Sequence, residues 1–83
     1  MDTIIQVRSL LGEVLQLGDR AQSLTQETAL LGSLPELDSM AVASVIASLE
    51  DRFDIIVEDD EISAETFRTV GSLTDYVELK LTQ

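Results

Sequence analysis

The sequence predicts a small all-α fold: a bundle of three longer helices and one short helix, with a long loop between the first two helices. Two observations lead to this prediction. Apolar residues recur every three or four positions in three segments, and no two segments show the strand pattern needed for pairing. A length of 83 residues with 45% hydrophobic residues is enough for one modest core. We therefore expect residues 1–83 to form a single domain.

The first helix is predicted over about residues 3–17, and Gly18 is well placed to end it. Its apolar stripe consists of Ile4, Val7, Leu10, Leu11, Val14 and Leu15. Residues 18–37 follow as a loop that is unusually long for a compact domain, and loops of this length are often functional. We expect four leucines to hold it on the core: Leu24, Leu30, Leu31 and Leu34.

The second helix is predicted over residues 39–53, with Asp38 as its N-cap. Its apolar stripe consists of Val42, Val45, Ile46, Leu49 and Phe53. The short apolar run at 55–57 has no strand pattern to pair with, so we predict a loop packed on the core.

The last part of the chain predicts a short helix near residues 64–67 and a final helix over about 70–81. Thr69 is a suitable N-cap for the final helix. The residues of this helix expected to face the core are Val70, Leu73, Val77 and Leu81.

The charge excludes several classes of function. Five basic residues oppose sixteen acidic ones, which gives a formal net charge of −11. Neutralised phosphates supply most of the affinity for nucleic acid, so nucleic-acid binding is excluded, and anionic membranes are disfavoured for the same reason. We see no signal peptide and no membrane-spanning stretch, so we expect no stable membrane insertion and a cytoplasmic location. The acidity favours basic partners, or serves solubility alone.

Ser39 is the candidate functional residue, because it stands where the loop meets the predicted helix 39–53. The chain has no histidine, no cysteine and no Gly-x-Ser-x-Gly motif, so no catalytic residue is predicted. Unpaired N–H groups and the positive end of the helix dipole would instead stabilise a phosphodiester attached there. Asp38 and Ser39 are equally compatible with a simple helix cap.

The segment 31–53 reads Leu-Gly-Ser-Leu-Pro-Glu-Leu-Asp-Ser-Met, then small and aliphatic residues, then Leu-Glu-Asp-Arg-Phe. It resembles the acyl carrier protein family, as do Phe67-x-Thr69-Val70 and the later Asp75-Tyr76-Val77. The resemblance covers nearly the whole chain and implies a helical bundle of acyl-carrier type. It implies that a phosphopantetheinyl transferase, with magnesium, moves 4′-phosphopantetheine from coenzyme A onto Ser39, which Asp38 precedes. The thiol of this arm would hold an acyl group as a thioester, so the chain would be a substrate of partner enzymes and no enzyme itself.

The resemblance also implies two sets of contact residues. The residues expected to dock partners are Met40, Ala41, Val42, Ser44, Glu50 and Asp51. The residues expected near an acyl pocket are Val42, Ile46, Leu49, Phe67 and Tyr76, with ordinary core packing as the alternative for each.

Ala41 and Ser44 stand where carriers of fatty-acid synthesis usually show acids, which indicates a specialised carrier. Its partners would be an acyl ligase, acyltransferase or synthase with a basic or apolar docking patch. We expect the carrier itself to be a monomer.

Three alternatives remain at this point. Leu37-Asp38-Ser39-Met40 also resembles D-alanyl carriers, which would make the cargo an amino acid. A helical protein-interaction module without a cofactor could use the helix 39–53 as its binding face. The acidic run 58–61 could bind divalent cations weakly, but it lacks the alternating ligands and central glycine of an EF-hand loop, so no metal site is predicted.

Overall fold

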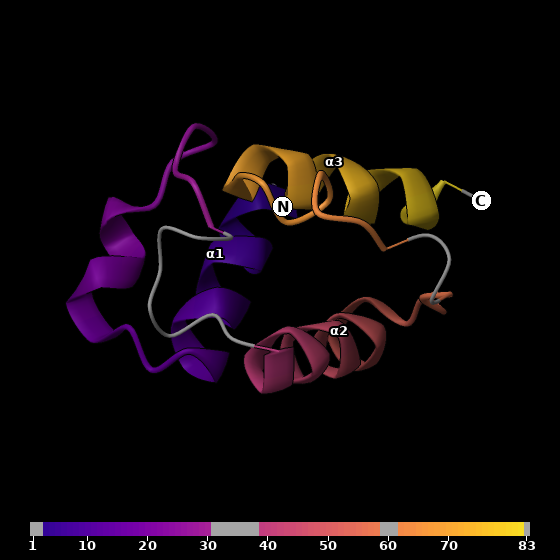
Figure 1. Cartoon of the computed structure of the whole chain (residues 1–83), viewed down its shortest axis with the longest axis horizontal. Coiled ribbons are helices and arrows are strands. Elements are labelled where there is room, and N and C mark those ends of the chain that lie inside the picture. Colours follow the sequence, from indigo (N-terminus) through magenta and orange to yellow (C-terminus); the bar gives the residue numbers. More distant parts are fainter. Residues whose placement is uncertain (1–2, 31–38, 59–61, 83) are drawn as a thin grey trace.

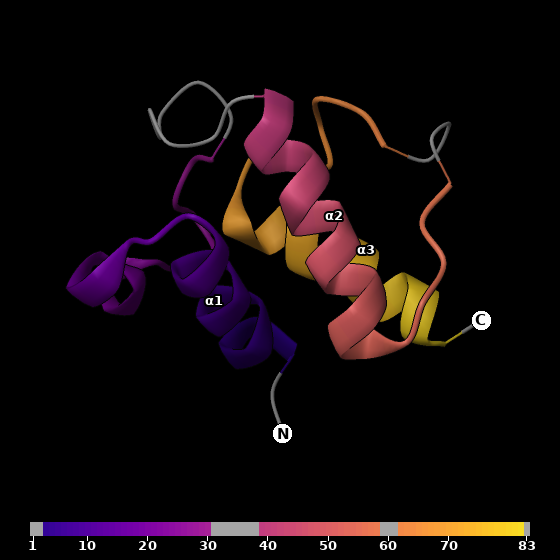
Figure 2. The same cartoon turned by 90° about the horizontal axis from the view of Figure 1, so that it is seen from below.

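The computed structural model describes residues 3–30, 39–58 and 62–82, and Ser39 by its backbone alone. Their elements are α1 (Thr3–Val14), the 3-10 helix η1 (Gly18–Ser23), α2 (Ser39–Phe53) and α3 (Val70–Leu81). Figures 1 and 2 show α1 beside both α2 and α3, with η1 on the outer side of α1. The described residues form no strand, so the predicted all-helical bundle is confirmed.

One hydrophobic core joins all the helices. Its fully buried side chains come from the three α-helices and the first loop: Val7, Leu10, Leu11, Leu30, Val45, Leu49, Val70, Leu73 and Val77. Leu24 and Leu30 anchor the long loop as predicted, whereas Leu31 and Leu34 lie outside the described residues. Leu81 was predicted to face the core, but it is exposed because it lies in the last turn of α3, at the edge of the packed region.

The first helix ends at Val14, three residues before its predicted end. Gln16 has a left-handed backbone with a φ of 55°, and the Leu17 N–H donates to the Gly12 carbonyl at 3.0 Å. These are features of a Schellman-type helix end, which an apolar pattern does not reveal because Leu15 and Leu17 remain buried after the helix has stopped.

The second and third helices have the predicted bounds. The second ends like the first, with Asp54 at a φ of 54° and the Ile55 N–H donating to the Glu50 carbonyl at 3.3 Å. The run 55–57 packs on the core only in part: Ile55 is buried, whereas Ile56 is 70% exposed, which corrects the prediction for that residue. The third begins with a capping box in which Thr69 and Ser72 exchange hydrogen bonds of 3.0 Å.

The short helix predicted near residues 64–67 is instead a series of hydrogen-bonded turns. Thr66 N–H donates to the Ser63 carbonyl at 3.1 Å, and Arg68 N–H donates to the Glu65 carbonyl at 3.2 Å. Such bonds between residues three apart do not build an α-helix, whose nucleation is costly in a short segment. The short helix of the bundle is η1, inside the segment that the sequence predicted as a loop.

The long loop is held at three places. Gly12 in α1 lets η1 approach closely, since a Cβ there would lie 2.7 Å from the Ala21 Cβ. Arg8 Nη1 donates to the Leu24 carbonyl at 3.2 Å. Residues 26–30 and 68–71 then pair through three backbone hydrogen bonds, which we call the latch: Leu30 N–H to Arg68 O at 3.0 Å, Val70 N–H to Thr28 O at 3.0 Å and Gly71 N–H to Gln26 O at 2.9 Å.

Candidate functional site

Ser39 is the first residue of α2, where the sequence predicted the start of this helix. The first N–H groups of a helix have no partner within the helix, and they form the positive end of its dipole. The first turn of α2 contains no acidic residue that would compensate this charge. The Ser39 side chain and the predicted cap Asp38 lie outside the described part of the chain.

One face of α2 is exposed from its start to its last turn. This face, which we call the α2 stripe, consists of Met40, Ala43, Ser44, Ala47 and Asp51. The Met40 side chain is 80% exposed. Three predicted docking residues belong to the stripe: Met40, Ser44 and Asp51. Ala43 and Ala47 share this exposed face but were not in the predicted docking set, although their spacing from the apolar positions of the helix could have placed them there.

The other predicted docking residues are partly used inside the molecule. Ala41 and Val42 are half-buried and pack against the core. The Glu50 carboxylate accepts a hydrogen bond of 3.0 Å from the Val57 N–H and so holds the chain after α2. Asp51 is exposed.

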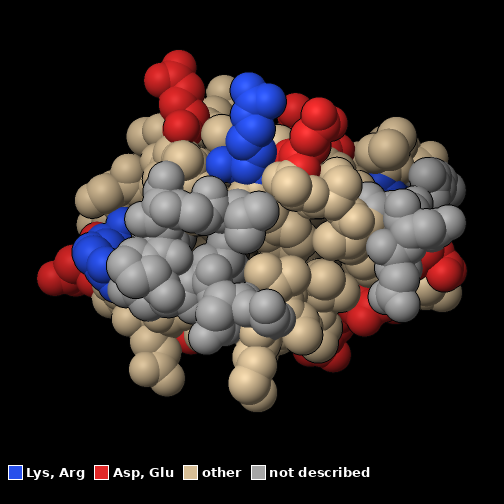
Figure 3. Space-filling model, viewed as in Figure 1, with Lys and Arg blue, Asp and Glu red and all other residues tan. Residues whose placement is uncertain are grey.

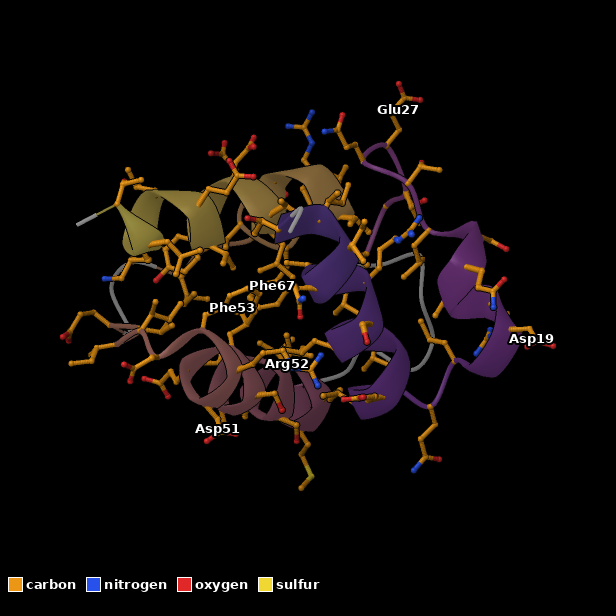
Figure 4. The ribbon with its side chains drawn as sticks, turned by 180° about the vertical axis from the view of Figure 1, so that it is seen from behind. Asp19, Glu27, Asp51, Arg52, Phe53 and Phe67 are labelled. Atoms are coloured by element: carbon orange, nitrogen blue, oxygen red, sulfur yellow. The ribbon has the colours of Figure 1, made fainter. Side chains whose placement is uncertain are left out.

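The cation beside these acids also has a structural partner. Arg52 Nη2 donates to Glu13 Oε2 of α1, which ties the two helices together. In Figure 4, Arg52 points toward α1 while Asp51 points away from the bundle. The charge of Arg52 is therefore partly balanced within the fold.

An apolar pocket of about 290 Å³ lies between α2 and the turn at residues 62–67. Its lining residues are Val42, Ile62, Ser63, Ala64 and Phe67. Two of the five predicted pocket residues, Val42 and Phe67, line it, and Figure 4 shows Phe67 in the interior of the bundle. None of these described lining residues is charged.

The remaining predicted pocket residues pack in the core. Leu49 is fully buried there, and Ile46 and Tyr76 are partly buried against it. Sequence reasoning missed Ile62 and Ala64, because they come from a segment without a helical repeat whose position is set by the tertiary fold.

Figure 3 shows acidic side chains at several places around one face of the molecule rather than in a single cluster. Within the described ranges, no three His, Cys, Asp or Glu side chains are grouped so that they could hold a metal ion. Of the acidic run 58–61, only Glu58 belongs to those ranges. Among the described helices, none is long and apolar enough to cross a membrane.

Comparison with known proteins identifies a family. The family model for the phosphopantetheine attachment site matches residues 6–77. An acyl carrier protein of an Exiguobacterium species is 35% identical over 78 residues, covering 94% of this chain and 92% of the relative. Another, from Streptococcus pyogenes, is 40% identical over 67 residues, with 81% and 82% covered.

A solved structure is similar as well. The solution NMR structure of a holo acyl carrier protein from Nitrosomonas europaea has a TM-score of 0.92 and 55% sequence identity, with both chains covered completely. The fold, the family model and the relatives agree with the resemblance found in the motifs around Ser39. The chain belongs to the acyl carrier protein family, whose cofactor is a covalently attached phosphopantetheine.

Proposed function

We propose that Ser39 is the attachment residue and that this chain carries acyl groups between partner enzymes without catalysing a reaction itself. The observation that supports this most is the position of Ser39 as first residue of α2, within the segment matched by the phosphopantetheine attachment model. We propose that residues 1–83 act as one carrier domain, monomeric and in the cytoplasm.

Modification of Ser39 needs a base from another protein. The serine oxygen forms the new bond to the phosphorus that bears the pantetheine arm in coenzyme A, and the bond to the nucleotide phosphate breaks. We propose that the phosphopantetheinyl transferase accepts the hydroxyl proton, because this chain has no histidine and its carboxylates form no recognisable motif with the serine. When bound, the cofactor supplies the thiol that holds an acyl group as a thioester.

What α2 contributes is electrostatic. A phosphodiester at Ser39 lies at the positive end of the helix dipole, which stabilises an exposed anion by roughly 0.3–1 kcal/mol. Asp38, the acid before the serine, stays a prediction from the family motif.

The α2 stripe is the surface that we propose for docking. Only one of its five residues, Asp51, is charged, in a chain of net charge −11. Apolar contact with Met40 and the two alanines would then dominate, with a basic group of the partner near Asp51. Such a patch is expected on an acyl ligase, acyltransferase or synthase that handles this carrier.

A charge-restoring variant tests this docking surface. Ala41 is half-buried, so the acids are better placed at Ser44 and Ala47. Ser44→Glu and Ala47→Glu should each speed acyl transfer by a fatty-acid-synthase acyltransferase, since opposite charges raise association rates. Gln22→Glu in η1 is the matched control for added charge away from α2. Equal rates for all three variants and the parent would contradict the role of the stripe.

The apolar pocket favours an aliphatic acyl group over an aminoacyl group as the sequestered cargo. The five described lining residues offer an ammonium group no carboxylate as a partner, which makes its desolvation costly, whereas each buried methylene contributes up to about 0.8 kcal/mol. Val42 and Phe67 would contact the chain directly. We propose that Ile46, Leu49 and Tyr76 support the pocket from the core.

Intact mass after incubation with coenzyme A, magnesium and a broad-specificity transferase tests the attachment residue. One phosphopantetheine should be added to the parent and none to Ser39→Ala. Ser9→Ala, which removes an exposed serine of α1 outside the α2 stripe, should be modified like the parent. Modification of Ser39→Ala would overturn the proposal by showing that the arm is attached to another residue. No modification of the parent by a panel of transferases would also overturn it and would favour a cofactor-free interaction module.

A further inference from the structure

The two sides of the apolar pocket are held in different ways. On one side, Ile62 is half-buried, and Ser63 and Ala64 are exposed. Ser63 bonds to Thr66, which belongs to the same turn. Ile62 packs against the core, but the hydrogen bonds given for Ser63 stay within this turn, so this rim of the pocket is held less firmly.

Another part of the lining is Phe67, which is buried and fixed from both directions along the chain. Before it, the Thr66 carbonyl accepts a hydrogen bond of 3.0 Å from Ser72 Oγ in α3. After it, the Arg68 carbonyl accepts the first hydrogen bond of the latch from Leu30 N–H. Moving Phe67 outward would break bonds to two other segments, so this wall is stiff.

Gly71 is the residue that lets the latch close. A Cβ at this position would lie 2.9 Å from the Gln26 carbonyl oxygen, a backbone atom that cannot rotate away. The same oxygen accepts the Gly71 N–H at 2.9 Å. Any side chain here forces residues 26–30 away from α3 and weakens the hydrogen bonds beside Phe67.

We propose that Gly71 is a positioning residue which, through the latch, fixes the Phe67 wall and limits the length of aliphatic acyl chain that the pocket accepts. This inference rests on the proposed function of the pocket. The latch stays closed when a chain that fits is loaded. A loosened latch lets the wall move, so that a longer chain fits.

The test compares Gly71→Ala with Gly12→Ala, a second tight glycine whose contact lies at η1, outside the latch. Parent and variants are loaded by a transferase with acetyl-, butyryl-, hexanoyl-, octanoyl-, decanoyl- or dodecanoyl-coenzyme A, and Tm is measured for each form. In the parent, Tm should rise with chain length and then level off. In Gly71→Ala, Tm should fall in all forms but level off at a longer chain.

The control separates this effect from simple destabilisation. Gly12→Ala should lower Tm in every form while the chain length at which Tm levels off stays that of the parent. In Gly71→Ala, amide hydrogen exchange at Leu30 and Val70 should be about tenfold faster than in the parent. In Gly12→Ala, the exchange rate of these two amides should change only as much as the lower global stability requires. The same chain-length limit in all three proteins would overturn the inference.

A measurement on the parent alone covers the case in which Gly71→Ala does not fold. Leu30 and Val70 amides should be equally protected in the acetyl and octanoyl forms, and loss of protection in the octanoyl form would contradict a latch that stays closed. A parent whose Tm does not change with chain length contradicts this inference and the proposed role of the pocket, but not the attachment of the cofactor at Ser39. A parent that accepts no phosphopantetheine contradicts the proposed function as well.

Discussion

The third helix packs far more extensively on α1 than on α2. The α1 side is completed by the first loop, which pairs with the start of α3 through the latch. The α2 side contains the apolar pocket. The turn at residues 62–67, which leads to α3, closes this pocket with exposed residues, Ser63 and Ala64. One side of α3 therefore supplies stability, while the other side leaves room for a ligand. Small domains have little stability to spare, so this division matters.

The largest effect should come from the core. Leu73 is fully buried in α3, and Leu73→Ala should lower the free energy of unfolding by about 2–5 kcal/mol through lost burial and a cavity. Val42→Ala, beside the existing pocket, should cost clearly less because its neighbours are already incompletely packed. Urea unfolding of both variants measures the two costs, and equal losses would erase the contrast between the two sides of α3.

The cap of α3 should come next. Thr69→Ala removes the hydroxyl that accepts the Ser72 N–H, and it should cost about 0.5–2 kcal/mol of stability. Thr82→Ala removes a hydroxyl that donates to the Leu79 carbonyl at the exposed end of the same helix, so it is the matched control with a smaller cost. Thermal unfolding of both variants measures the two losses of stability. Equal losses would mean that the cap at the start of α3 stabilises the fold no more than the bond at its exposed end.

A glycine at the end of α2 should stabilise the fold. Asp54 has a positive φ, which costs an L-residue free energy that glycine avoids, so Asp54→Gly should add about 0.5–1 kcal/mol. Asp51→Gly, within the helix, should destabilise by a similar amount. Chemical denaturation distinguishes the two signs, and destabilisation by Asp54→Gly would show that its side chain has another role.

The smallest effect should be that of the ion pair between α1 and α2. Arg52 and Glu13 are partly exposed, so a double-mutant cycle with alanine at both positions should give a coupling of about 0.2–1 kcal/mol. Raising the salt concentration should reduce it. A coupling that salt does not change would mean that the pair is shielded from solvent.

The helices show how far the sequence could predict this molecule. The bounds of α2 and α3 follow from local signals: a stripe of apolar residues and, for α3, the cap Thr69. Ser39 could be placed at the start of α2 for the same reason. The end of α1 and the helix η1 could not be predicted in this way, because apolar residues remain buried beyond Val14 although the backbone changes direction at Gln16.

The pocket and the latch could not be predicted from local sequence patterns, because both are formed by segments that meet only in the folded chain. Val42 and Phe67 could be named from the family motif, but Ile62 lines the pocket only because the turn folds back over α2. The latch joins residues far apart in the sequence, and its one sequence signal is a glycine inside the third helix. Gly71 is the second residue of α3, where the missing side chain leaves room for the backbone of Gln26.

The long connection between α1 and α2 has a consequence for the order of folding. Its first part is closed by nearby partners, at Gly12 and then at Leu24, so each closure spans a short length of chain and costs little entropy. The latch needs the start of α3, which is synthesised much later and must be brought from far along the chain. Contacts of high sequence separation form slowly, so we expect η1 to settle on α1 first. Residues 26–30 would then be secured only when the last helix docks.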